Sequence, residues 1–354
     1  MKYNIFTLGE LVTIKYGKNQ KKVQSEDGTI PIYGTGGLMG YATDALYDKP
    51  SVLIGRKGTI NKVHYVNHPF WTVDTLFYTE VNEKLVIPKY LYYLMSLLDL
   101  GSYNEGTTIP SLRTETLNRL EFGIPDLDYQ EKVLSMLEPI DKKIKLNNEI
   151  NNNLEQQAMA IFKSWFIDYE PYNRTVPNNW VEYKLSDFLP VITGKKNANV
   201  SSSIGTYPFF SCSQDITWTN EYSFEGNAIL VAGNGDFNVK FYNGKFEAYQ
   251  RTYVLIPHNP RFSAWLFYAV KYNLNKITAA ARGSVIKFIT KGNLENFSFY
   301  APLNLDDFDV IDQFTAINNI ITSNREENAC LSDLRDILLP KLMSGELDVS
   351  DIDI

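Results

Sequence analysis

The chain has 354 residues, of which 44% are hydrophobic and 21% charged, a composition typical of a globular protein large enough for two domains. Its two cysteines, Cys212 and Cys330, are too few for a disulfide framework, and with no signal peptide ahead of them they favour the reducing cytoplasm. The formal net charge of −7 does not exclude a polyanionic partner, because residues 303–354 alone carry −9 while residues 177–302 carry +4.

The first part of the chain alternates short strand-like runs with turns. Apolar and β-branched residues predict strands over residues 51–54, 62–66 and 72–79. Glycine-rich turns separate these runs, and Pro88 begins a helix predicted over residues 88–98. This order of elements predicts a mixed α/β domain over residues 1–127.

A long helix is predicted next, over residues 128–170. The segment contains no glycine and a single proline, Pro139, before Asp168. Its apolar residues recur at spacings of three and four with two asparagines among them, which is the pattern of a coiled-coil seam. The predicted seam residues are Leu137, Ile140, Ile144, Asn147, Asn151, Leu154 and Ile161. Forty helical residues would reach about 60 Å.

The second half of the chain repeats the first. Gly58 and Asn61 match Gly235 and Asn238 at an offset of 177, and positions in the two helical segments match at an offset of 180. A repeat of this length is a whole domain with its appended helix. Strands are predicted over residues 228–232, 239–241 and 252–256, followed by a helix after Pro260, in a second mixed domain over residues 171–304. A second long helix and a C-terminal tail occupy residues 305–354, with predicted seam residues Ile317, Ile320, Asn324, Leu331, Leu334 and Leu338.

An amphipathic helix of this length needs a partner for its apolar stripe, and each helix is the obvious partner of the other. We therefore expect an α+β protein with two pseudo-repeated mixed α/β domains separated by a pair of long coiled-coil helices. Asparagines in the seam would fix the register of the pair at a cost in stability. The alternative is that each helix only completes the core of its neighbouring domain.

No catalytic constellation is apparent in the sequence. The three histidines, His64, His68 and His258, lack the spacing of a metal site or of a nucleophilic relay, so we expect no metal. The glycines of residues 34–40 lack the spacing of a dinucleotide-binding loop. The longest apolar run, residues 90–100, is too short to span a membrane.

Two motifs resemble enzyme signatures but fit them poorly. Asn259-Pro-Arg-Phe262 resembles the adenine methyltransferase motif, yet arginine replaces the second proline and a helix start is favoured. Pro125-Asp126 with Asp141 has the letters of a nuclease motif, but Asp141 falls within the predicted long helix instead of on a strand. Binding is therefore favoured over catalysis.

The loops between matched strands carry side chains that can read DNA. Arginine and lysine bind guanine, asparagine and glutamine bind adenine, and aspartate accepts from cytosine, while the other lysine, serine and threonine groups suit phosphates. In the first repeat the candidates are Lys18, Asn19, Arg56, Lys57, Thr59, Asn61, Thr107, Thr108 and Arg113. In the second repeat they are Lys195, Lys196, Gln214, Asn234, Asp236, Arg251, Arg282, Ser284 and Lys287.

Each of these residues alone is more simply a solvated surface group. Those beside Gly58 and Gly235, and those beside Gly106 and Gly283, stand out because they occupy equivalent loops in both copies. Aromatic residues could also contact bases, but for them burial in a domain core is favoured; they are Tyr33, Trp71 and Trp218.

The order of these features resembles the specificity subunit of type I restriction-modification systems. The resemblance covers essentially the whole chain, and the local signatures that match are Leu8-Gly-Glu-Leu11 with Gly17-Lys18, Ile30-Pro-Ile-Tyr33, Phe122-Gly-Ile-Pro125, Trp180-Val-Glu-Tyr-Lys-Leu185 and Leu339-Pro-Lys-Leu-Met-Ser-Gly345. One departure is that Phe162-Lys-Ser-Trp-Phe-Ile-Asp168 replaces the glycine-containing helix end found at Gly345.

The resemblance implies that each domain reads one half of a split, asymmetric target in double-stranded DNA. The helices would pack antiparallel, set the gap between the halves and dock two methyltransferase subunits, which bind S-adenosylmethionine and methylate adenine N6 after base flipping. Restriction subunits that use ATP and Mg would join through them. The chain itself would bind no cofactor and have no activity alone.

Two other classes of function remain as alternatives. The chain could be a self-contained DNA methyltransferase or nuclease with unrecognised motifs. It could also be a tandem adaptor that binds proteins instead of DNA, in which case its retention of DNA would be neither sequence-selective nor salt-sensitive.

Overall fold

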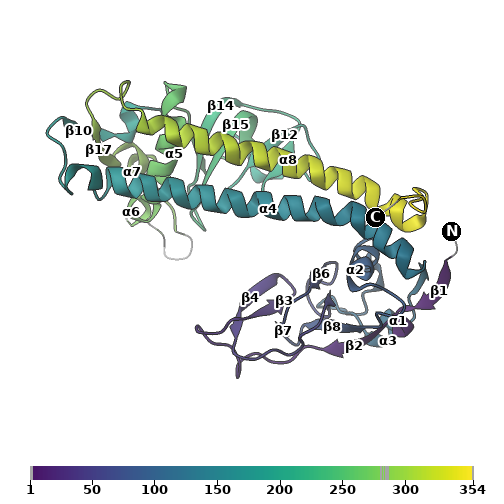
Figure 1. Cartoon of the computed structure of the whole chain (residues 1–354). Coiled ribbons are helices and arrows are strands. Elements are labelled where there is room, and N and C mark those ends of the chain that lie inside the picture. The colour runs from purple at the N-terminus through teal and green to yellow at the C-terminus, as the bar shows by residue number, and fades with distance from the viewer. Residues whose placement is uncertain (1–2, 280, 282, 284–286, 353–354) are drawn as a thin grey trace. The chain divides into compact units, whose positions relative to one another are not determined.

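The computed structural model of the chain describes residues 3–279, 281, 283 and 287–352. It divides into two compact units, unit 1 over Met1–Lys145 with Asn328–Ile354, and unit 2 over Leu146–Glu327. Each unit therefore contains one mixed domain together with part of both long helices, α4 (Leu127–Phe166) and α8 (Val310–Ser344). Figure 1 shows the elements of each unit.

Unit 1 combines two small sheets, a strand pair and short helices. The strands are β1 (Asn4–Thr7), β2 (Val12–Tyr16), β3 (Ile30–Gly34), β4 (Gly37–Ala42), β5 (Ser51–Gly55), β6 (Val63–Val66), β7 (Trp71–Thr72), β8 (Leu76–Val81) and β9 (Glu121–Ile124). The helices are α1 (Leu8–Leu11), α2 (Pro88–Ser96), η1 (Leu100–Tyr103) and α3 (Thr114–Asn118). The strand orders are β2-β8-β5-β6, β4-β3-β7 and β1-β9.

Unit 2 has the same plan with its two sheets merged. The strands are β10 (Trp180–Lys184), β11 (Val191–Thr193), β12 (Tyr207–Phe210), β13 (Thr217–Thr219), β14 (Phe224–Ala232), β15 (Val239–Ala248), β16 (Thr252–Leu255) and β17 (Ser298–Pro302). The helices are η2 (Glu170–Tyr172), η3 (Leu185–Asp187), η4 (Ala198–Val200), η5 (Pro260–Phe262), α5 (Ser263–Tyr272), α6 (Leu274–Thr278) and α7 (Lys291–Glu295). The strand orders are β11-β16-β14-β15-β12-β13 and β10-β17.

The strand pairings confirm the repeat. The order β2-β8-β5-β6 of unit 1 corresponds to β11-β16-β14-β15 of unit 2. Each unit also has a parallel strand pair. In unit 1, β3 pairs in parallel with β7, and in unit 2, β12 pairs in parallel with the end of β15. The α+β class and the duplicated mixed domain with long helices are therefore confirmed.

The predicted strands differ from the observed ones in two places. The predicted strand over residues 72–79 is two strands, because a turn separates β7 from β8. In this turn the Leu76 N–H donates to the Val73 carbonyl at 3.0 Å. The predicted strand over residues 239–241 extends to Ala248, since β15 pairs antiparallel with β14 from Val239 to Phe246 and then in parallel with β12.

The ends of the long helices belong to the domain cores. In unit 1, Leu137 of α4 and Leu339 and Leu342 of α8 are buried with Tyr90 and Leu91 of α2. In unit 2 the buried cluster joins α4 and α8 to α5, through Ala158, Phe162, Phe166, Ile311, Phe314, Trp265 and Tyr268. At their ends the two long helices therefore complete the cores of the neighbouring domains, as the alternative interpretation predicts.

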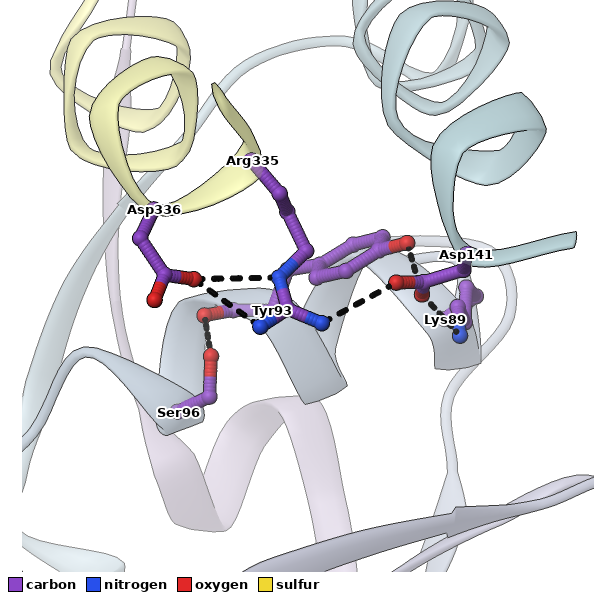
Figure 2. A network of polar contacts seen from close by, with 6 residues as sticks. All are labelled: Lys89, Tyr93, Ser96, Asp141, Arg335 and Asp336. Atoms are coloured by element: carbon purple, nitrogen blue, oxygen red, sulfur yellow. Dashed lines mark hydrogen bonds and ion pairs between the residues drawn. The ribbon is translucent and has the colours of Figure 1, made fainter. Parts of the chain in front are cut away.

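A polar network joins α2 to both long helices in unit 1 (Figure 2). The Asp141 carboxylate on α4 accepts from the Tyr93 hydroxyl at 2.5 Å, from Lys89 Nζ at 3.1 Å and from Arg335 Nη1 of α8 at 3.3 Å. Burial alone would raise the pKa of Asp141, but these hydrogen bonds and the charge of Lys89 outweigh it and lower the pKa.

Within unit 2, α4 and α8 run antiparallel. The Asn324 side-chain amide donates to Asn151 Oδ1 at 2.8 Å, and further along α4 the ring of Phe162 lies 6.3 Å from that of Phe314, earlier in α8. Asn151 is buried, with 7% of its surface exposed. The predicted polar position in the seam is therefore filled by a hydrogen-bonded pair.

The predicted seam is only partly correct. Leu137, Asn147 and Asn151 are buried, and a further set is partly buried, namely Ile140, Ile144, Leu154, Ile161, Ile317, Asn324, Leu331 and Leu338. The prediction is wrong for Ile320 and Leu334, which are 48% and 43% exposed. In unit 2 the buried residues of α8 include Phe314, Asn318 and Ile321. The buried face of α8 is therefore shifted by one residue from the predicted seam of Ile317, Ile320 and Asn324.

The described residues contain neither a membrane-spanning helix nor a metal-binding cluster. No helix among them is both long enough and apolar enough to cross a bilayer. No cluster of three or more histidine, cysteine, aspartate or glutamate side chains suited to a metal ion is found in the same part of the chain.

Candidate nucleic-acid interface

The candidate residues of unit 1 centre on the turn after β5. The Gly58 N–H donates to the Pro110 carbonyl at 2.9 Å, and the Leu112 N–H donates to the Arg56 carbonyl at 3.0 Å. Gly58 has a φ of 89°, a conformation that side chains disfavour. These contacts bring Lys57 and Thr59 beside the loop that carries Thr107 and Thr108.

Arg56 is held at the base of this turn. Its backbone N–H donates to the Thr75 carbonyl at 2.8 Å, and its Nη1 donates to the Asp74 carbonyl at 2.8 Å. The guanidinium carbon also lies 5.0 Å from the centre of the Tyr16 ring, a cation–π distance. The side chain is therefore positioned by its own domain and remains partly exposed.

The loop of residues 104–113 is closed on itself. Asn104 Oδ1 accepts from the backbone N–H groups of Gly106 and Ser111 at 2.9 and 2.8 Å. A Cβ at Gly106 would lie 1.9 Å from the Ile109 carbonyl oxygen, so only glycine fits there. Arg113 pairs with Glu105 at 3.1 Å, which neutralises one candidate cation.

Lys18 joins the same end of the sheet. The Gly17 N–H donates to the Leu76 carbonyl and the Lys18 N–H to the Thr72 carbonyl, at 3.0 and 2.8 Å. Trp71 Nε1 donates to the Lys18 carbonyl at 2.8 Å, so the partly buried Trp71 supports this turn. Asn19 follows, with its Oδ1 accepting from the Lys21 N–H at 2.9 Å.

The equivalent turn of unit 2 has the same backbone frame. The Gly235 N–H donates to the Lys287 carbonyl at 2.9 Å and the Ile289 N–H to the Gly233 carbonyl at 3.0 Å. Gly235 has a φ of 73°. These bonds join the Asn234–Asp236 turn to Lys287, at the positions equivalent to those joined in unit 1.

A second loop of unit 2 is tied to this turn through Asn238 and Lys240. The Asn238 side-chain amide donates to the carbonyls of Cys212 and Asp236 at 2.9 and 3.0 Å. Lys240 Nζ donates to the Ser213 carbonyl at 2.6 Å, and burial lowers its pKa. The loop that carries Gln214 therefore lies against the turn that carries Asp236.

Arg251 and the lysines after β11 complete the predicted set. The Gly233 N–H donates to the Arg251 carbonyl at 2.9 Å, which places Arg251 at the same turn. Lys196 forms an ion pair with Glu221 at 2.6 Å, while Lys195 lies 5.7 Å from the Phe224 ring centre. Arg282 and Ser284 lie outside the described residues.

Unit 1 has several exposed lysines near the turn after β5. Lys18, Lys21, Lys22 and Lys57 are exposed, and within the residues that the structure describes none of their ammonium groups forms a salt bridge. Unneutralised lysines beside hydroxyl and amide side chains can bind a phosphate backbone. Asn61 is also exposed, next to the turn.

The aromatic residues do not all lie in the core. Tyr33 is partly buried with its hydroxyl 3.3 Å from His68 Nε2, but Trp218, for which burial was expected, is 40% exposed on β13. Trp218 lies on β13, the last strand in the order of the six-stranded sheet, and its side chain stays exposed. Sequence reasoning also missed Tyr41, which is 45% exposed on β4.

The amino-acid sequence is similar to known specificity subunits. The family described as the type I restriction modification DNA specificity domain matches residues 1–156 and 177–329. The type I restriction enzyme EcoDI specificity subunit of Escherichia coli is 39% identical over 127 residues, 36% of this chain and 28% of that protein. The MjaIX specificity subunit of Methanocaldococcus jannaschii is 23% identical over 357 residues, 87% of this chain and 80% of that protein. The chain thus spans little more than a quarter of the E. coli relative.

A solved structure has the same fold. The S subunit of the type I restriction-modification system of M. genitalium superposes with a TM-score of 0.62 at 15% identity, over 97% of this chain and 96% of that chain. Since the family match covers most of both repeats, the chain belongs to the family of type I restriction-modification specificity subunits and has two target-recognition domains.

Proposed function

We propose that the chain is the non-catalytic subunit that selects the DNA target of a type I restriction-modification complex. Each recognition domain reads one half of a bipartite, asymmetric site in double-stranded DNA. The supporting observation is the pair of equivalent glycine turns, in which the same backbone bonds at Gly58 and Gly235 present different polar side chains. Two different readers in one frame fit a target with two different halves.

The residues that read or hold the DNA are the candidates gathered at these turns. In unit 1, Arg56 and Lys57 suit guanine, and the exposed lysines at positions 18, 21 and 22 suit phosphates. In unit 2, Asn234 and Gln214 suit adenine, and Asp236 suits cytosine. Arg113 and Lys196 already pair with acids, so we propose that they position their loops.

The chemistry belongs to other subunits of the complex. Two methyltransferase subunits, which bind S-adenosylmethionine and methylate adenine N6, dock on the long helices, and ATP- and Mg-dependent restriction subunits join through them. The helices leave apolar side chains exposed, with Leu146 and Ile150 of α4 at 50% and 38%, and Leu334 and Ile337 of α8 at 43% and 59%. Exposed apolar groups along a helix fit a surface for protein partners.

Methyl transfer from labelled S-adenosylmethionine to DNA tests this division of labour. The chain alone should transfer no methyl group, and the chain with its cognate methyltransferase should methylate adenines at one bipartite sequence. Transfer by the chain alone would identify a self-contained methyltransferase. Complex formation without sequence-selective, salt-sensitive DNA binding would identify a protein adaptor.

The gap between the half-sites tests the role of the helices. We propose that α4 and α8 act as a spacer, and removal of one heptad from each at equivalent positions shortens such a spacer by about 10 Å, roughly three base pairs. The methylated sites should keep both half-site sequences and change only the gap. An unchanged gap would contradict the spacer role.

A further inference from the structure

Both recognition domains expose apolar side chains on a β-hairpin. The β3–β4 hairpin of unit 1 exposes Met39 at 56% and Tyr41 at 45%. The β12–β13 hairpin of unit 2 exposes Ile216 at 48% and Trp218 at 40%. Met39 and Tyr41 match Ile216 and Trp218 at the repeat offset of 177.

The two aromatic residues occupy the same structural position. Tyr41 lies opposite Pro31 in the β3–β4 register, and Trp218 lies opposite Pro208 in the β12–β13 register. On the other edge, the Ser25 N–H donates to the Tyr41 carbonyl at 3.0 Å and the Ser202 N–H donates to the Trp218 carbonyl at 2.9 Å. Each aromatic residue is therefore fixed on both sides by backbone contacts while its side chain stays exposed.

The segments beside these hairpins carry lysine. Lys21 and Lys22 precede the strand-like residues that bond to Tyr41, and Lys195 and Lys196 precede those that bond to Trp218. In unit 1 the lysines have no acidic partner within the described residues, while in unit 2 Glu221 neutralises Lys196. The same segments also carry exposed acids, Glu26 and Asp27 after Ser25 and Asp215 before Ile216, so their charge is mixed. DNA is favoured as the occupant because the proposed function gives both domains a DNA partner and because Lys21 and Lys22 are not neutralised within the described residues.

An aromatic side chain can bind DNA without reading its sequence. In a duplex, where each base face is covered by its neighbour, such a side chain can insert between two base steps, and this contact tolerates many sequences because every base has a π face. A contact of this kind would add affinity to both half-sites alike. That agrees with an aromatic residue at equivalent positions in both domains, whereas the reading loops differ.

We infer that Tyr41 and Trp218 contact DNA, each in the half-site bound by its own domain, by packing the aromatic ring against the bases. This inference rests on the proposed function and deepens it. It makes the two hairpins affinity elements that are separate from the reading turns at Gly58 and Gly235.

The test uses the full chain in complex with its methyltransferase, and a duplex bearing the site mapped for the wild-type complex. Tyr41→Ala and Trp218→Ala should each raise the Kd about tenfold, equivalent to about 1.4 kcal/mol, and leave the recognised sequence unchanged. Trp218→Phe should restore most of the affinity because it keeps an aromatic ring. Tyr300→Ala is the matched control, since Tyr300 is also 40% exposed in unit 2 but lies on β17, and it should bind as the wild type.

Three results would overturn the inference. If the wild-type complex binds its site and both alanine variants match it, the hairpins do not contact DNA, although the proposed function stands. If the alanine variants lose the methyltransferase and keep their affinity for DNA, the hairpins bind protein. If the wild-type complex shows no selective binding, the proposed function is wrong and the inference fails with it.

Discussion

The two recognition domains share a backbone frame but not the side chains that the frame presents. The bond from Gly58 to Pro110 and the bond from Gly235 to Lys287 are both 2.9 Å long, at positions that match by the repeat offset. Arg56 and Lys57 stand at the turn of unit 1, where Gly233 and Asn234 stand in unit 2. Strands and glycines therefore fix the turn, and its polar residues can differ between the domains without loss of the fold.

The attachment of each domain to the long helices differs in a similar way. Unit 1 uses the network around Asp141, which joins Lys89, Tyr93 and Arg335 (Figure 2). Unit 2 uses an ion pair between Lys271 of α5 and Glu155 of α4, next to a large aromatic cluster. Glu155 and Arg335 match by the helix offset of 180, so equivalent positions hold opposite charges.

Of the variants that test these two attachments, Asp141→Ala should lose the most stability. Asp141→Ala leaves Lys89, the Tyr93 hydroxyl and Arg335 without their shared acceptor, at a cost of about 2 kcal/mol, less than for a fully buried pair because the group is partly exposed. Glu155→Ala should cost about 1 kcal/mol, since the aromatic cluster of unit 2 remains. Hydrogen exchange of amides in α2 and in α5 measures the two effects separately.

A control and a pH series sharpen that result. Ser96→Ala removes a hydroxyl that donates to the Tyr93 carbonyl at 2.7 Å without touching Asp141, and it should weaken α2 less than Asp141→Ala does. Because the pKa of Asp141 is lowered in the folded chain, its contribution should be complete above the ordinary carboxyl pKa of about 3.9 and disappear as the pH falls through the lowered value. Equal protection of α2 in the wild type and in Asp141→Asn at neutral pH would contradict this account.

The asparagine pair of unit 2 should give a smaller effect. Asn151→Leu or Asn324→Leu alone breaks the hydrogen bond between the two side chains and should cost about 1–2 kcal/mol. The double variant should recover most of this loss, because an apolar pair replaces a polar one. A double-mutant cycle on unit 2 unfolding measures the coupling, and strictly additive losses would show that the 2.8 Å bond is unimportant.

The two turn glycines should show the smallest and most nearly equal effects. Gly58→Ala and Gly235→Ala introduce a Cβ into open space but at positive φ, which costs about 1 kcal/mol in each unit. Gly106→Ala is the contrast, because its Cβ would meet the Ile109 carbonyl at 1.9 Å and the loop would have to move. Thermal unfolding of the three variants should place Gly106→Ala well below the other two.

The repeat made much of this fold predictable from the sequence. A fixed offset of 177 identified equivalent strands and the turns at Gly58 and Gly235, and helical spacing identified α4 and α8. The inward face of α8 could not be predicted to one residue, because Ile317, Ile320 and Ile321 offer two apolar stripes and the choice depends on Phe314 packing on Phe162.

Side-chain exposure on the hairpins was also beyond sequence reasoning. Trp218 and Tyr41 are residue types common in protein cores, and their exposure depends on which face of each hairpin the rest of the domain leaves uncovered. The sequence does show that the two aromatic residues are equivalent, although it does not show that they are exposed. Both aromatics lie ten residues after a proline, Pro31 or Pro208, and at the same repeat offset.

Mapping N6-methyladenine in DNA modified by the methyltransferase together with variants of this chain shows which half-site each domain reads. Arg56→Ala should reduce discrimination between bases in the first half-site by about 1–3 kcal/mol and leave the second half-site and the gap unchanged. Asn234→Ala should reduce discrimination in the second half-site and leave the first half-site and the gap unchanged. Relaxation of both half-sites by either single variant would contradict the claim that each domain reads its own half.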